Sequence, residues 1–381
     1  MLVDLISASN WTIHPKRKNL NVTVETRKGV GNIPISMYKP FKALVSYLGG
    51  KRKLVPEIFK HVPSSVDAPV FADGFVGGCS VSLFAKARGH IVLANDLSVR
   101  SFIPAKALIE NNTILIEEED ILKLFVPVKT DDFILSTYTP KVFTRKIARF
   151  LDIAFENIKT MPEHKQWIMK LLLIKFIMST KPFGHMTMGA KSIESLDQGQ
   201  YEDGLKKRSY AKNNLRQVHN PAIFLRELAS RINYAVCDNG NENRVYQGDV
   251  FDFVKNIKAD VIYLDPPYAD TVSYEESYVI LDNILKGRKD KPVVSVFTKK
   301  DALEFIDKLC KASTHIKDWI ISMGQPDPSR GISPEELLKV VRKYKPKAEY
   351  RILDHSWSVD NSNSKKKKDV VEYIIYTHYA K

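Results

Sequence analysis

A strand, a glycine-rich turn, a helix and a second strand follow one another within residues 69–96, and this unit constrains the fold most. PVFAD (69–73) is short and apolar, GFVGGCS (74–80) is rich in glycine, and IVLAND (91–96) ends on an acid. Two strands joined by a helix are typical of a parallel sheet, because strands that run the same way need a long crossover connection. We therefore expect an α/β fold, with a Rossmann-like sheet and helices on both of its faces.

The glycine-rich turn is typical of a nucleotide-type cofactor site. Glycines at a strand-to-helix turn let backbone N–H groups approach a ligand, and an acid that ends the next strand can accept hydrogen bonds from ribose hydroxyls. The sequence predicts Phe75, Gly77 and Gly78 in the loop and Asp96 as the ribose anchor. The spacing differs from the Gly-x-Gly-x-x-Gly pattern of dinucleotide sites and lacks the Gly-Lys-Ser/Thr ending of a P-loop, which disfavours both of those classes.

A second apolar segment ends in residues that neither a strand nor a helix favours. VIYL (261–264) has the β-branched and aromatic bias of a buried strand, and Asp265, Pro266, Pro267 and Tyr268 follow it. Proline cannot donate to a sheet ladder and fixes its own φ, so the chain must form a rigid corner past the end of the strand. In open α/β sheets ligands bind at that edge. The same corner could also be a plain strand terminator with a solvated acid.

The composition indicates a soluble protein with polyanionic partners. The chain of 381 residues carries 58 Lys and Arg against 44 Asp and Glu, a net charge of +14. Its three cysteines are far apart and form no Cys-x-x-Cys pair, so we expect neither a disulfide framework nor a metal site. No signal peptide is evident, and the most apolar stretch (167–180) contains two lysines, which indicates a core helix. We expect a cytoplasmic, nucleoid-associated protein without membrane contact.

The interval between Asp96 and Asp249 is far longer than a crossover between neighbouring strands requires, which predicts an inserted subdomain. The insertion is expected to be mainly helical up to about residue 180, and polar, basic and rich in loops after it. We divide the chain into an N-terminal extension (1–40), a first catalytic part with the cofactor loop (41–125), an inserted helical and target-recognition region (126–240) and a second catalytic part (241–381).

Other segments of the two catalytic parts predict regular elements from their apolar periodicity. Further strands are expected at residues 245–249, 260–265, 292–297 and 372–379. Further helices are expected near residues 224–235, 277–286, 301–312 and 334–343.

Five segments together resemble the Dam-type family of adenine-N6 DNA methyltransferases. In chain order they are SYLGGKRKL (46–54), FADGFVGGCSV (71–81), IVLANDLS (91–98), GDVFDF (248–253) and LDPPYAD (264–270). The order matches as well as the content, with the lysine-containing segment first and a long insertion before the DPPY motif. The resemblance covers most of residues 41–300. It implies a class I methyltransferase fold, S-adenosylmethionine as the methyl donor and double-stranded DNA as the substrate.

The resemblance also implies roles for individual residues of this sequence. The residues expected at the cofactor are Tyr47, Lys51, Phe75, Gly77, Gly78, Asp96, Asp249 and Asp265. Those expected to receive the target base are Asp265, Pro266, Pro267 and Tyr268. The Asp265 carboxylate and the Pro266 carbonyl would accept the N–H bonds of the adenine amine and direct its lone pair at the sulfonium methyl, in a direct displacement without a metal. Tyr268 would stack on a base rotated out of the duplex.

The basic tract at residues 181–220 fits a target-recognition region. Its expected phosphate contacts are Lys206, Lys207, Arg208, Lys212 and Arg216, and its expected base readers are Tyr210 and Asn213 or Asn214. The partners expected are double-stranded DNA and, as a further candidate, a cognate restriction endonuclease. We expect a monomer or weak dimer.

Two positions depart from the family's pattern, and two other functions compete with DNA methylation. Cys79 stands where a third glycine is usual, and ISMG (321–324) lacks an expected Asn. One alternative is an RNA or protein amide methyltransferase with the same pocket. The other is a catalytically silent DNA-binding protein on a methyltransferase scaffold, which the Cys79 departure alone supports.

Overall fold

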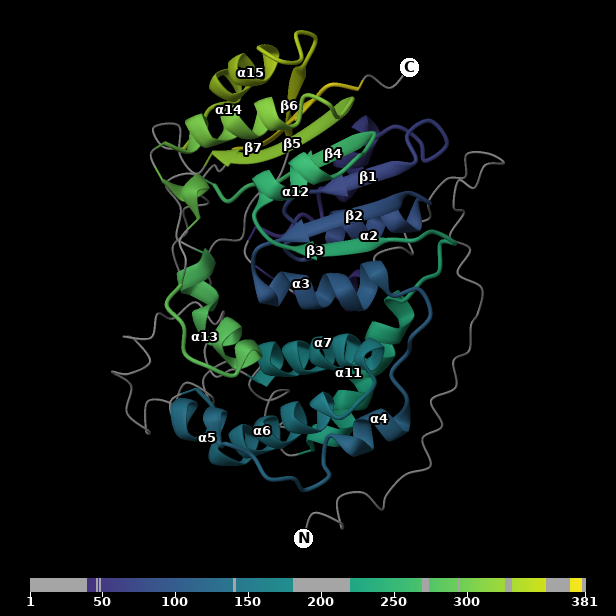
Figure 1. Ribbon diagram of the computed structural model, residues 1–381, viewed down its shortest axis with the longest axis vertical. Helices are drawn as coiled ribbons and strands as arrows, with labels where there is room; N and C mark the ends of the chain where they lie inside the picture. The colour runs from purple at the N-terminus through teal and green to yellow at the C-terminus, as the bar shows by residue number, and fades with distance from the viewer. Residues whose placement is uncertain are drawn as a thin grey trace, which may run out of the picture.

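Seven strands of the described residues form one mixed sheet, in the order β3-β2-β1-β4-β5-β7-β6 (Figure 1). The computed structural model describes residues 40–45, 47, 49–139, 142–180, 220–268, 274–292, 295–299, 301–325, 331–353 and 371–378. The parallel strands are β1 (Val70–Asp73), β2 (Ile91–Asp96), β3 (Arg244–Gln247), β4 (Val261–Leu264) and β5 (Asp318–Gln325). The antiparallel strands are β6 (Glu349–Leu353) and β7 (Val371–Tyr376), and β7 pairs with β5.

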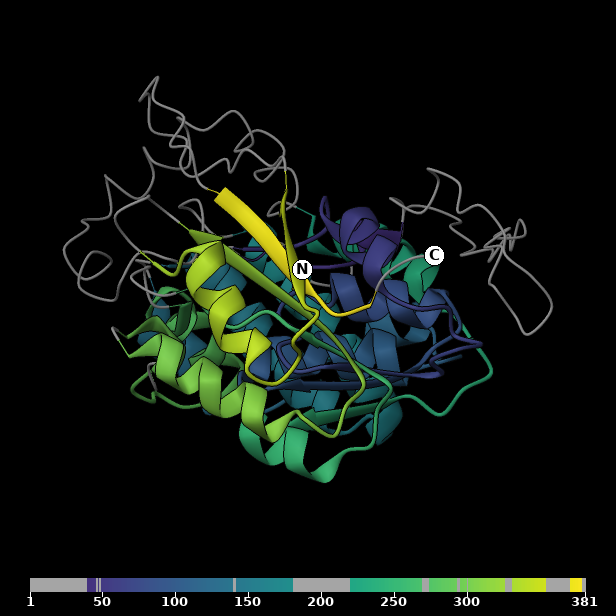
Figure 2. The same ribbon diagram turned by 90° about the horizontal axis from the view of Figure 1, so that it is seen from above.

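The apolar residues of the central strands alternate between two cores, as the pleat of a strand requires. On one face Phe71 and Tyr263 pack with the helices α1 (Val55–Ile58), α2 (Ser80–Ala87) and α3 (Val99–Ala105). On the other face Ala72 and Ile262 pack with α12 (Val250–Asn256), α14 (Ala302–Ala312) and α15 (Pro334–Arg342). Figure 2 shows α14 and α15 on the side of the sheet opposite to α1. The predicted α/β sheet with helices on both faces is therefore confirmed.

A further layer of helices packs beneath α3, with α7 (Glu163–Thr180) at its centre (Figure 1). It contacts α3, the π-helical turn η5 (Lys106–Glu110), α6 (Arg145–Lys159) and α11 (Pro221–Ala235). Helices α4 (Glu118–Lys123), α5 (Phe133–Tyr138) and α13 (Tyr274–Lys286) complete this part of the molecule. A helix with neighbours on all sides is apolar all round, which explains the composition of residues 167–180.

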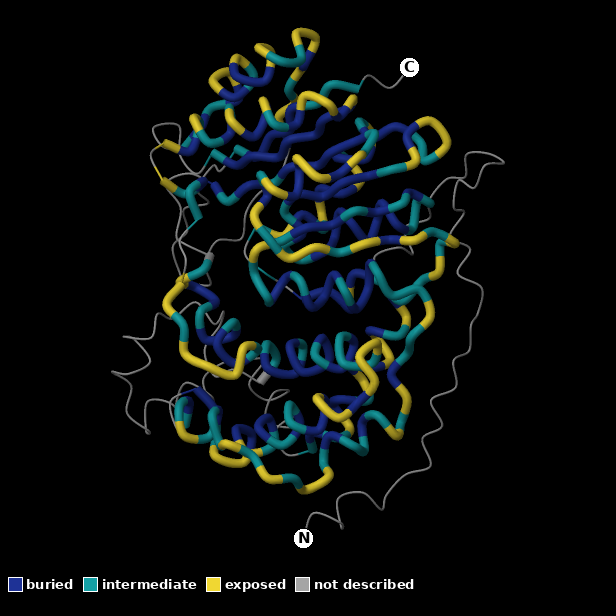
Figure 3. The backbone as a smooth tube through the Cα atoms, in the orientation of Figure 1, coloured by how far each residue is buried: buried dark blue, intermediate teal, exposed yellow. Residues whose placement is uncertain are grey.

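The burial of α7 confirms the predicted core helix, since its residues from Ile168 to Ile177, the two lysines apart, are fully buried (Figure 3). Lys175 is tolerated because its Nζ donates to the carbonyls of Lys42 and Leu44, each at 2.8 Å. These bonds attach α7 to the segment that leads into Tyr47. None of the helices among the described residues combines the length and the apolar composition that a membrane span requires.

One predicted strand is wrong in its described part. Residues 292–297 were expected to pair in the sheet, but Val296–Thr298 form the 3₁₀ turn η6. The Ser295 side chain accepts a hydrogen bond from the Phe297 N–H and so begins a turn. The strand beside β4 is instead β5, which contains the ISMG segment, and β6 was not predicted because its residues at the sheet edge are largely exposed.

Asp152 on α6 caps a neighbouring helix, which gives a first prediction. Its carboxylate is 6 % exposed and accepts the N–H groups of Ile134 and Leu135 at 2.8 and 2.9 Å, in the first turn of α5. Asp152→Ala leaves these donors without an acceptor, so we expect a loss of about 1–3 kcal/mol in the free energy of unfolding. Urea denaturation measures this loss. The exposed Asp131, bonded to the Phe133 N–H, is the control, and an equal loss in Asp131→Ala would contradict the assignment.

Candidate active site

A cavity of about 490 Å³ opens where the carboxyl ends of β1, β2 and β4 meet. The loop after β1, the start of α3 and the helix α13 complete its walls. Asn95, which is 2 % exposed, connects the segment after β1 to the segment after β3, because its Nδ2 donates to the carbonyls of Gly74 and Gly248. Concave sites at this edge are where open α/β sheets bind ligands.

The loop between β1 and α2 has a backbone path that glycines at two positions favour. Gly77 has a φ of +49°, in the left-handed region. At Gly74 a Cβ would lie 2.9 Å from Leu264 Cδ2, so a side chain there would push the loop away from β4. At Gly78 a Cβ would come within 3.4 Å of the Val45 carbonyl. The backbone at Gly74, Gly77 and Gly78 therefore lines the cavity without a side chain of its own.

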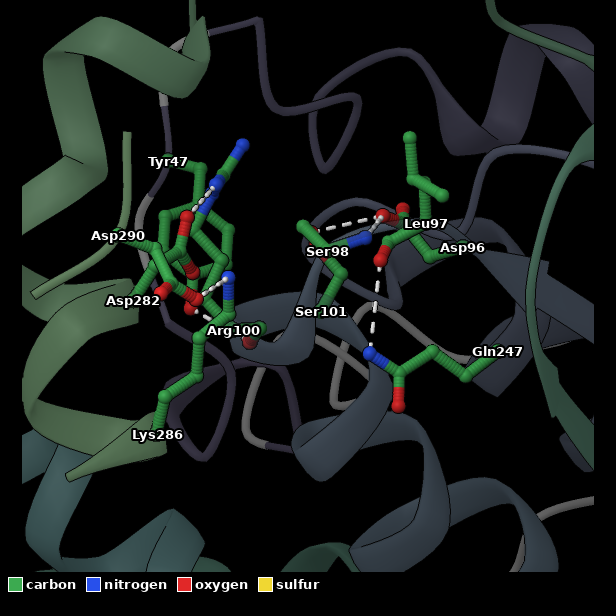
Figure 4. A network of polar contacts seen from close by, with 10 residues as sticks. All are labelled: Tyr47, Asp96, Leu97, Ser98, Arg100, Ser101, Gln247, Asp282, Lys286 and Asp290. Atoms are coloured by element: carbon green, nitrogen blue, oxygen red, sulfur yellow. Dashed lines mark hydrogen bonds and ion pairs between the residues drawn. The ribbon is translucent and has the colours of Figure 1, made fainter. Parts of the chain in front are cut away.

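The carboxylate of Asp96 is held in place beside this loop (Figure 4). Its Oδ2 accepts the Gly77 N–H at 2.9 Å, and its Oδ1 accepts the Ser98 N–H and hydroxyl at 2.9 and 2.7 Å. A carboxylate offers about four acceptor positions, so these three bonds leave capacity for a further donor from the cavity. The side chain is therefore fixed in position and can still bind a ligand hydroxyl.

A second polar group lies on the wall formed by α3 and α13 (Figure 4). Arg100 pairs with Asp282, and the Tyr47 hydroxyl donates to the Arg100 carbonyl at 2.8 Å. The Arg100 guanidinium lies 5.1 Å from the centre of the Tyr278 ring, and that ring packs against Tyr47 in a T-shaped arrangement. These contacts join the segment before β1 to the helix that follows the DPPY motif.

Lys51, Asp265, Tyr268 and Glu372 form a buried group that we call the Lys51 cluster. Lys51 Nζ lies 2.8 Å from Asp265 Oδ1 and 3.3 Å from Glu372 Oε1, and it donates to the Tyr268 hydroxyl oxygen at 2.6 Å. The Tyr268 hydroxyl in turn donates to Glu372 Oε1 at 2.6 Å. Lys51 is 4 % exposed and Glu372 is 0 % exposed, so these charges are balanced by one another and not by water.

Burial raises the pKa of Asp265 and Asp73, two of the carboxyl groups that line the cavity. It raises the pKa of Asp265 to about 6, because the charge of Lys51 offsets only part of the desolvation and Glu372 adds to it. It raises the pKa of Asp73 to about 7, although Ser82 and the Phe75 N–H donate to that carboxylate. Perturbed carboxyl groups in a cavity are typical of catalytic sites.

Every residue expected at the cofactor or the target base lines this one cavity. They are Tyr47, Lys51, Phe75, Gly77, Gly78, Asp96, Asp249, Asp265, Pro266, Pro267 and Tyr268. Asp249 also caps α12 by accepting the Phe251 N–H at 2.8 Å. The expected DNA contacts Lys206, Lys207, Arg208, Lys212 and Arg216, with Tyr210, Asn213 and Asn214, lie outside the described residues.

Comparison with known proteins decides which family has this site. The family model of the D12 class N6 adenine-specific DNA methyltransferase matches residues 47–324. The Type II methyltransferase M2.HphI of Haemophilus parahaemolyticus is 30 % identical over 89 % of this chain and 99 % of its own length. The chain belongs to the D12 class of N6 adenine-specific DNA methyltransferases.

Other relatives of this D12 methyltransferase are more distant. Modification methylase StsI of Streptococcus sanguinis is 24 % identical over 87 % of this chain and 51 % of its own length. The Type II methyltransferase M.CviAII of Paramecium bursaria Chlorella virus 1 is 24 % identical over 64 % of this chain and 70 % of its own length. The predicted family and activity are thereby confirmed, and the finding favours DNA over an RNA or protein substrate.

The structure explains both departures of this D12 methyltransferase from the expected pattern. Cys79 has a φ of +63° and is fully buried, and it does not line the cavity, so its side chain takes no space from a ligand bound there. The segment 321–324, in which an Asn was expected, ends on Gly324, and a Cβ there would lie 2.3 Å from Tyr268 Cε2. The Tyr268 ring occupies the space that a side chain at position 324 would need.

Sequence reasoning missed Glu372, Arg100 and Asp282. A single acid within the apolar strand segment VEYIIY is a signal that could have drawn attention to Glu372, because a buried acid needs a partner. Arg100 and Asp282 carry no such signal, since they are 182 positions apart and meet only through the packing of α3 on α13.

The left-handed backbone of Cys79 leads to a second prediction. Cys79→Val places a β-branched residue at positive φ, so we expect a loss of about 1–3 kcal/mol in the free energy of unfolding. Cys79→Gly removes the backbone strain but also removes a buried side chain, so we expect the free energy of unfolding to change by no more than about 1 kcal/mol. Denaturant unfolding measures both. Cys310→Val, at a buried helical cysteine of α14, is the matched control, and a loss there as large as at Cys79 would contradict the argument.

Proposed function

We propose that this D12 methyltransferase transfers the methyl group of S-adenosylmethionine to the N6 amine of an adenine rotated out of double-stranded DNA at a specific sequence. One observation carries the proposal. The glycine loop, the ribose-type acid Asp96 and the DPPY corner with its Lys51-paired Asp265 all face a single cavity. A nucleoside cofactor and a base could therefore meet there without a rearrangement of the sheet.

The residues present fit S-adenosylmethionine. The cavity volume of about 490 Å³ lies within the range of about 300–1,000 Å³ that is usual for small-molecule sites. Asp96 has acceptor capacity for a ribose hydroxyl, Asp249 lies at the neighbouring rim for the adenine, and the loop at Gly77 and Gly78 admits the methionine portion. When bound, the cofactor supplies an electrophilic methyl group on its sulfonium.

The DPPY corner supplies what the target amine lacks. An exocyclic aromatic amine is a poor nucleophile, because its lone pair is delocalised into the ring. Acceptance of its N–H bonds by the Asp265 carboxylate and the Pro266 carbonyl favours a pyramidal nitrogen with a free lone pair. The two prolines hold that carbonyl, and Tyr268 forms a wall on which the base stacks.

Lys51 supports this chemistry by keeping Asp265 ionised. Burial favours the neutral carboxyl group, which could no longer accept two hydrogen bonds as well. The ammonium at 2.8 Å opposes that effect. In this proposal Lys51 thus acts on the catalytic carboxylate in addition to any contact with the cofactor.

We also propose a target-recognition region, a functional partner, a location and an oligomeric state for this protein. Residues 126–240 form the target-recognition region, with the basic tract as its DNA contact. The cognate restriction endonuclease of a type II system is the functional partner, a role supported by the names of the relatives. The protein acts on DNA in the cytoplasm as a monomer or weak dimer.

Methylation assayed with purified protein tests the proposal. With duplex DNA and labelled S-adenosylmethionine we expect N6-methyladenine, detected by mass spectrometry of the nucleosides. Asp265→Ala should lower kcat by at least about 100-fold while DNA and cofactor binding persist, because an acceptor needed in the transition state is lost. Asp252→Asn, at an exposed acid of α12, is the control with unchanged kcat. Methylation of RNA and not of DNA would contradict the proposal.

The raised pKa of Asp265 gives a pH prediction. The carboxylate form is the acceptor, and it is lost as the pH falls through about 6. We therefore expect kcat/KM to fall about tenfold per pH unit below that value and to level off above it. A profile that stays flat well below pH 6 would show that Asp265 does not act as the ionised acceptor.

A further inference from the structure

Glu372 is buried beside the proposed catalytic residues, although the transfer chemistry gives it no task. It lies on β7, is 0 % exposed, and accepts a hydrogen bond from the Tyr268 hydroxyl at 2.6 Å. Its Oε1 also lies 3.3 Å from Lys51 Nζ. Burial of a second acid near Asp265 is unfavourable by itself, so its contacts with Tyr268 and Lys51 must offset that cost.

Gly324, on the neighbouring strand β5, leaves the space that the Tyr268 ring occupies. Gly324 of β5 and Glu372 of β7 are direct partners in the antiparallel register. A Cβ at position 324 would lie 2.3 and 2.8 Å from Cε2 and Cδ2 of Tyr268, and 3.0 Å from Glu372 Oε2. No side chain fits there unless the ring or the carboxylate moves. The glycine therefore lets the Tyr268 ring lie against the sheet with its hydroxyl at Glu372.

We propose that Glu372 is a positioning residue of the methyl-transfer site, which together with Gly324 holds Tyr268 and Lys51 against Asp265. This inference rests on the proposed role of Asp265 as the acceptor of the target amine. Glu372 fixes the Tyr268 ring through the hydroxyl, and it fixes the Lys51 ammonium between two carboxylates. Glu372 on β7 thus positions both Tyr268, on which the target base stacks, and Lys51, which keeps Asp265 ionised.

Glu372 also acts on Asp265 through its charge, in the sense opposite to Lys51. The groups that face Asp265 are Lys51 from the segment before β1, Glu372 from β7, Asp73 from β1 and Tyr263 from β4. Of these, Lys51 lowers the pKa of Asp265 and Glu372 raises it. Neutralisation of Glu372 should therefore lower that pKa, an effect that a purely structural residue would not have.

The test uses Glu372→Gln, which keeps the length and an acceptor for the Tyr268 hydroxyl but removes the charge. The first readout needs neither cofactor nor DNA. It is the pKa of Asp265 in the protein alone, followed by ¹³C NMR of labelled aspartate carboxyl groups and assigned with Asp265→Asn. We expect the pKa to fall below the wild-type value of about 6, and the acid limb of kcat/KM to move to lower pH with it.

The second readout is the kinetics of methyl transfer well above the pKa of Asp265. We expect kcat to fall about 10- to 100-fold in Glu372→Gln, with KM for S-adenosylmethionine changed much less, because the uncharged amide holds the Tyr268 hydroxyl less firmly and a shift of that ring affects the reacting geometry, while Lys51 stays paired with Asp265. Glu372→Asp restores the charge but not the reach. It should keep the wild-type acid limb and still show a reduced kcat.

Glu349→Gln is the matched control. Glu349 lies on β6 of the same sheet and accepts a hydrogen bond from the Tyr376 hydroxyl at 3.1 Å, but it is exposed. This variant should leave both the pKa of Asp265 and kcat unchanged. An unchanged pKa and kcat in folded Glu372→Gln would overturn the proposal.

Gly324→Ala keeps the proposal testable if Glu372→Gln fails to fold. Its Cβ displaces the Tyr268 ring, so we expect kcat to fall by a similar factor while the unfolding midpoint is largely retained. A fully active Gly324→Ala would overturn the proposed role of Gly324 in positioning Tyr268. The NMR measurement remains valid if wild-type protein transfers no methyl group, so failure of the inference and failure of the proposed function can be told apart.

Discussion

The ion pair between Lys51 and Asp265 is the contact on which the rest of the site depends. Its atoms lie 2.8 Å apart in a largely buried setting, and loss of one partner from such a pair costs about 3–5 kcal/mol. Lys51 precedes β1, Asp265 follows β4, and Glu372 on β7 contacts the same ammonium. Through Lys51, three segments that are distant in the sequence thus meet at one buried charge at the cavity.

The helical layer supports this arrangement from the other side. Lys175 of the buried helix α7 donates to the carbonyls of Lys42 and Leu44, just before Tyr47 enters the cavity. The hydroxyl of Tyr47 bonds the backbone of Arg100, which pairs with Asp282 on α13. These side-chain hydrogen bonds and the ion pair therefore connect the helices around α7 to the wall of the cavity.

Sequence patterns identified the parts of the site that backbone chemistry fixes. Glycines in a strand-to-helix turn allow a left-handed backbone and close approach, and prolines after a buried strand restrict the chain, so these patterns predicted Gly77, Gly78 and Asp265 as ligand-facing residues, and the family resemblance implied that they share one site. Contacts across strands were beyond reach, because the pairing of Gly324 with Glu372 depends on a register that no local pattern records. The strand predicted at 292–297 is wrong in its described part, where the Ser295 hydroxyl accepts the Phe297 N–H and a 3₁₀ turn forms instead.

The position of Glu372 has a consequence for how the protein becomes active during synthesis. The glycine loop and the DPPY corner leave the ribosome well before β7, which begins at Val371, yet β7 supplies a side chain of the Lys51 cluster and pairs with β5. A growing chain that ends before residue 371 would carry both motifs without the strand that seats Tyr268. Competence to methylate would then arise late, when the antiparallel strand docks, and a nascent chain would leave DNA untouched until its sheet is closed.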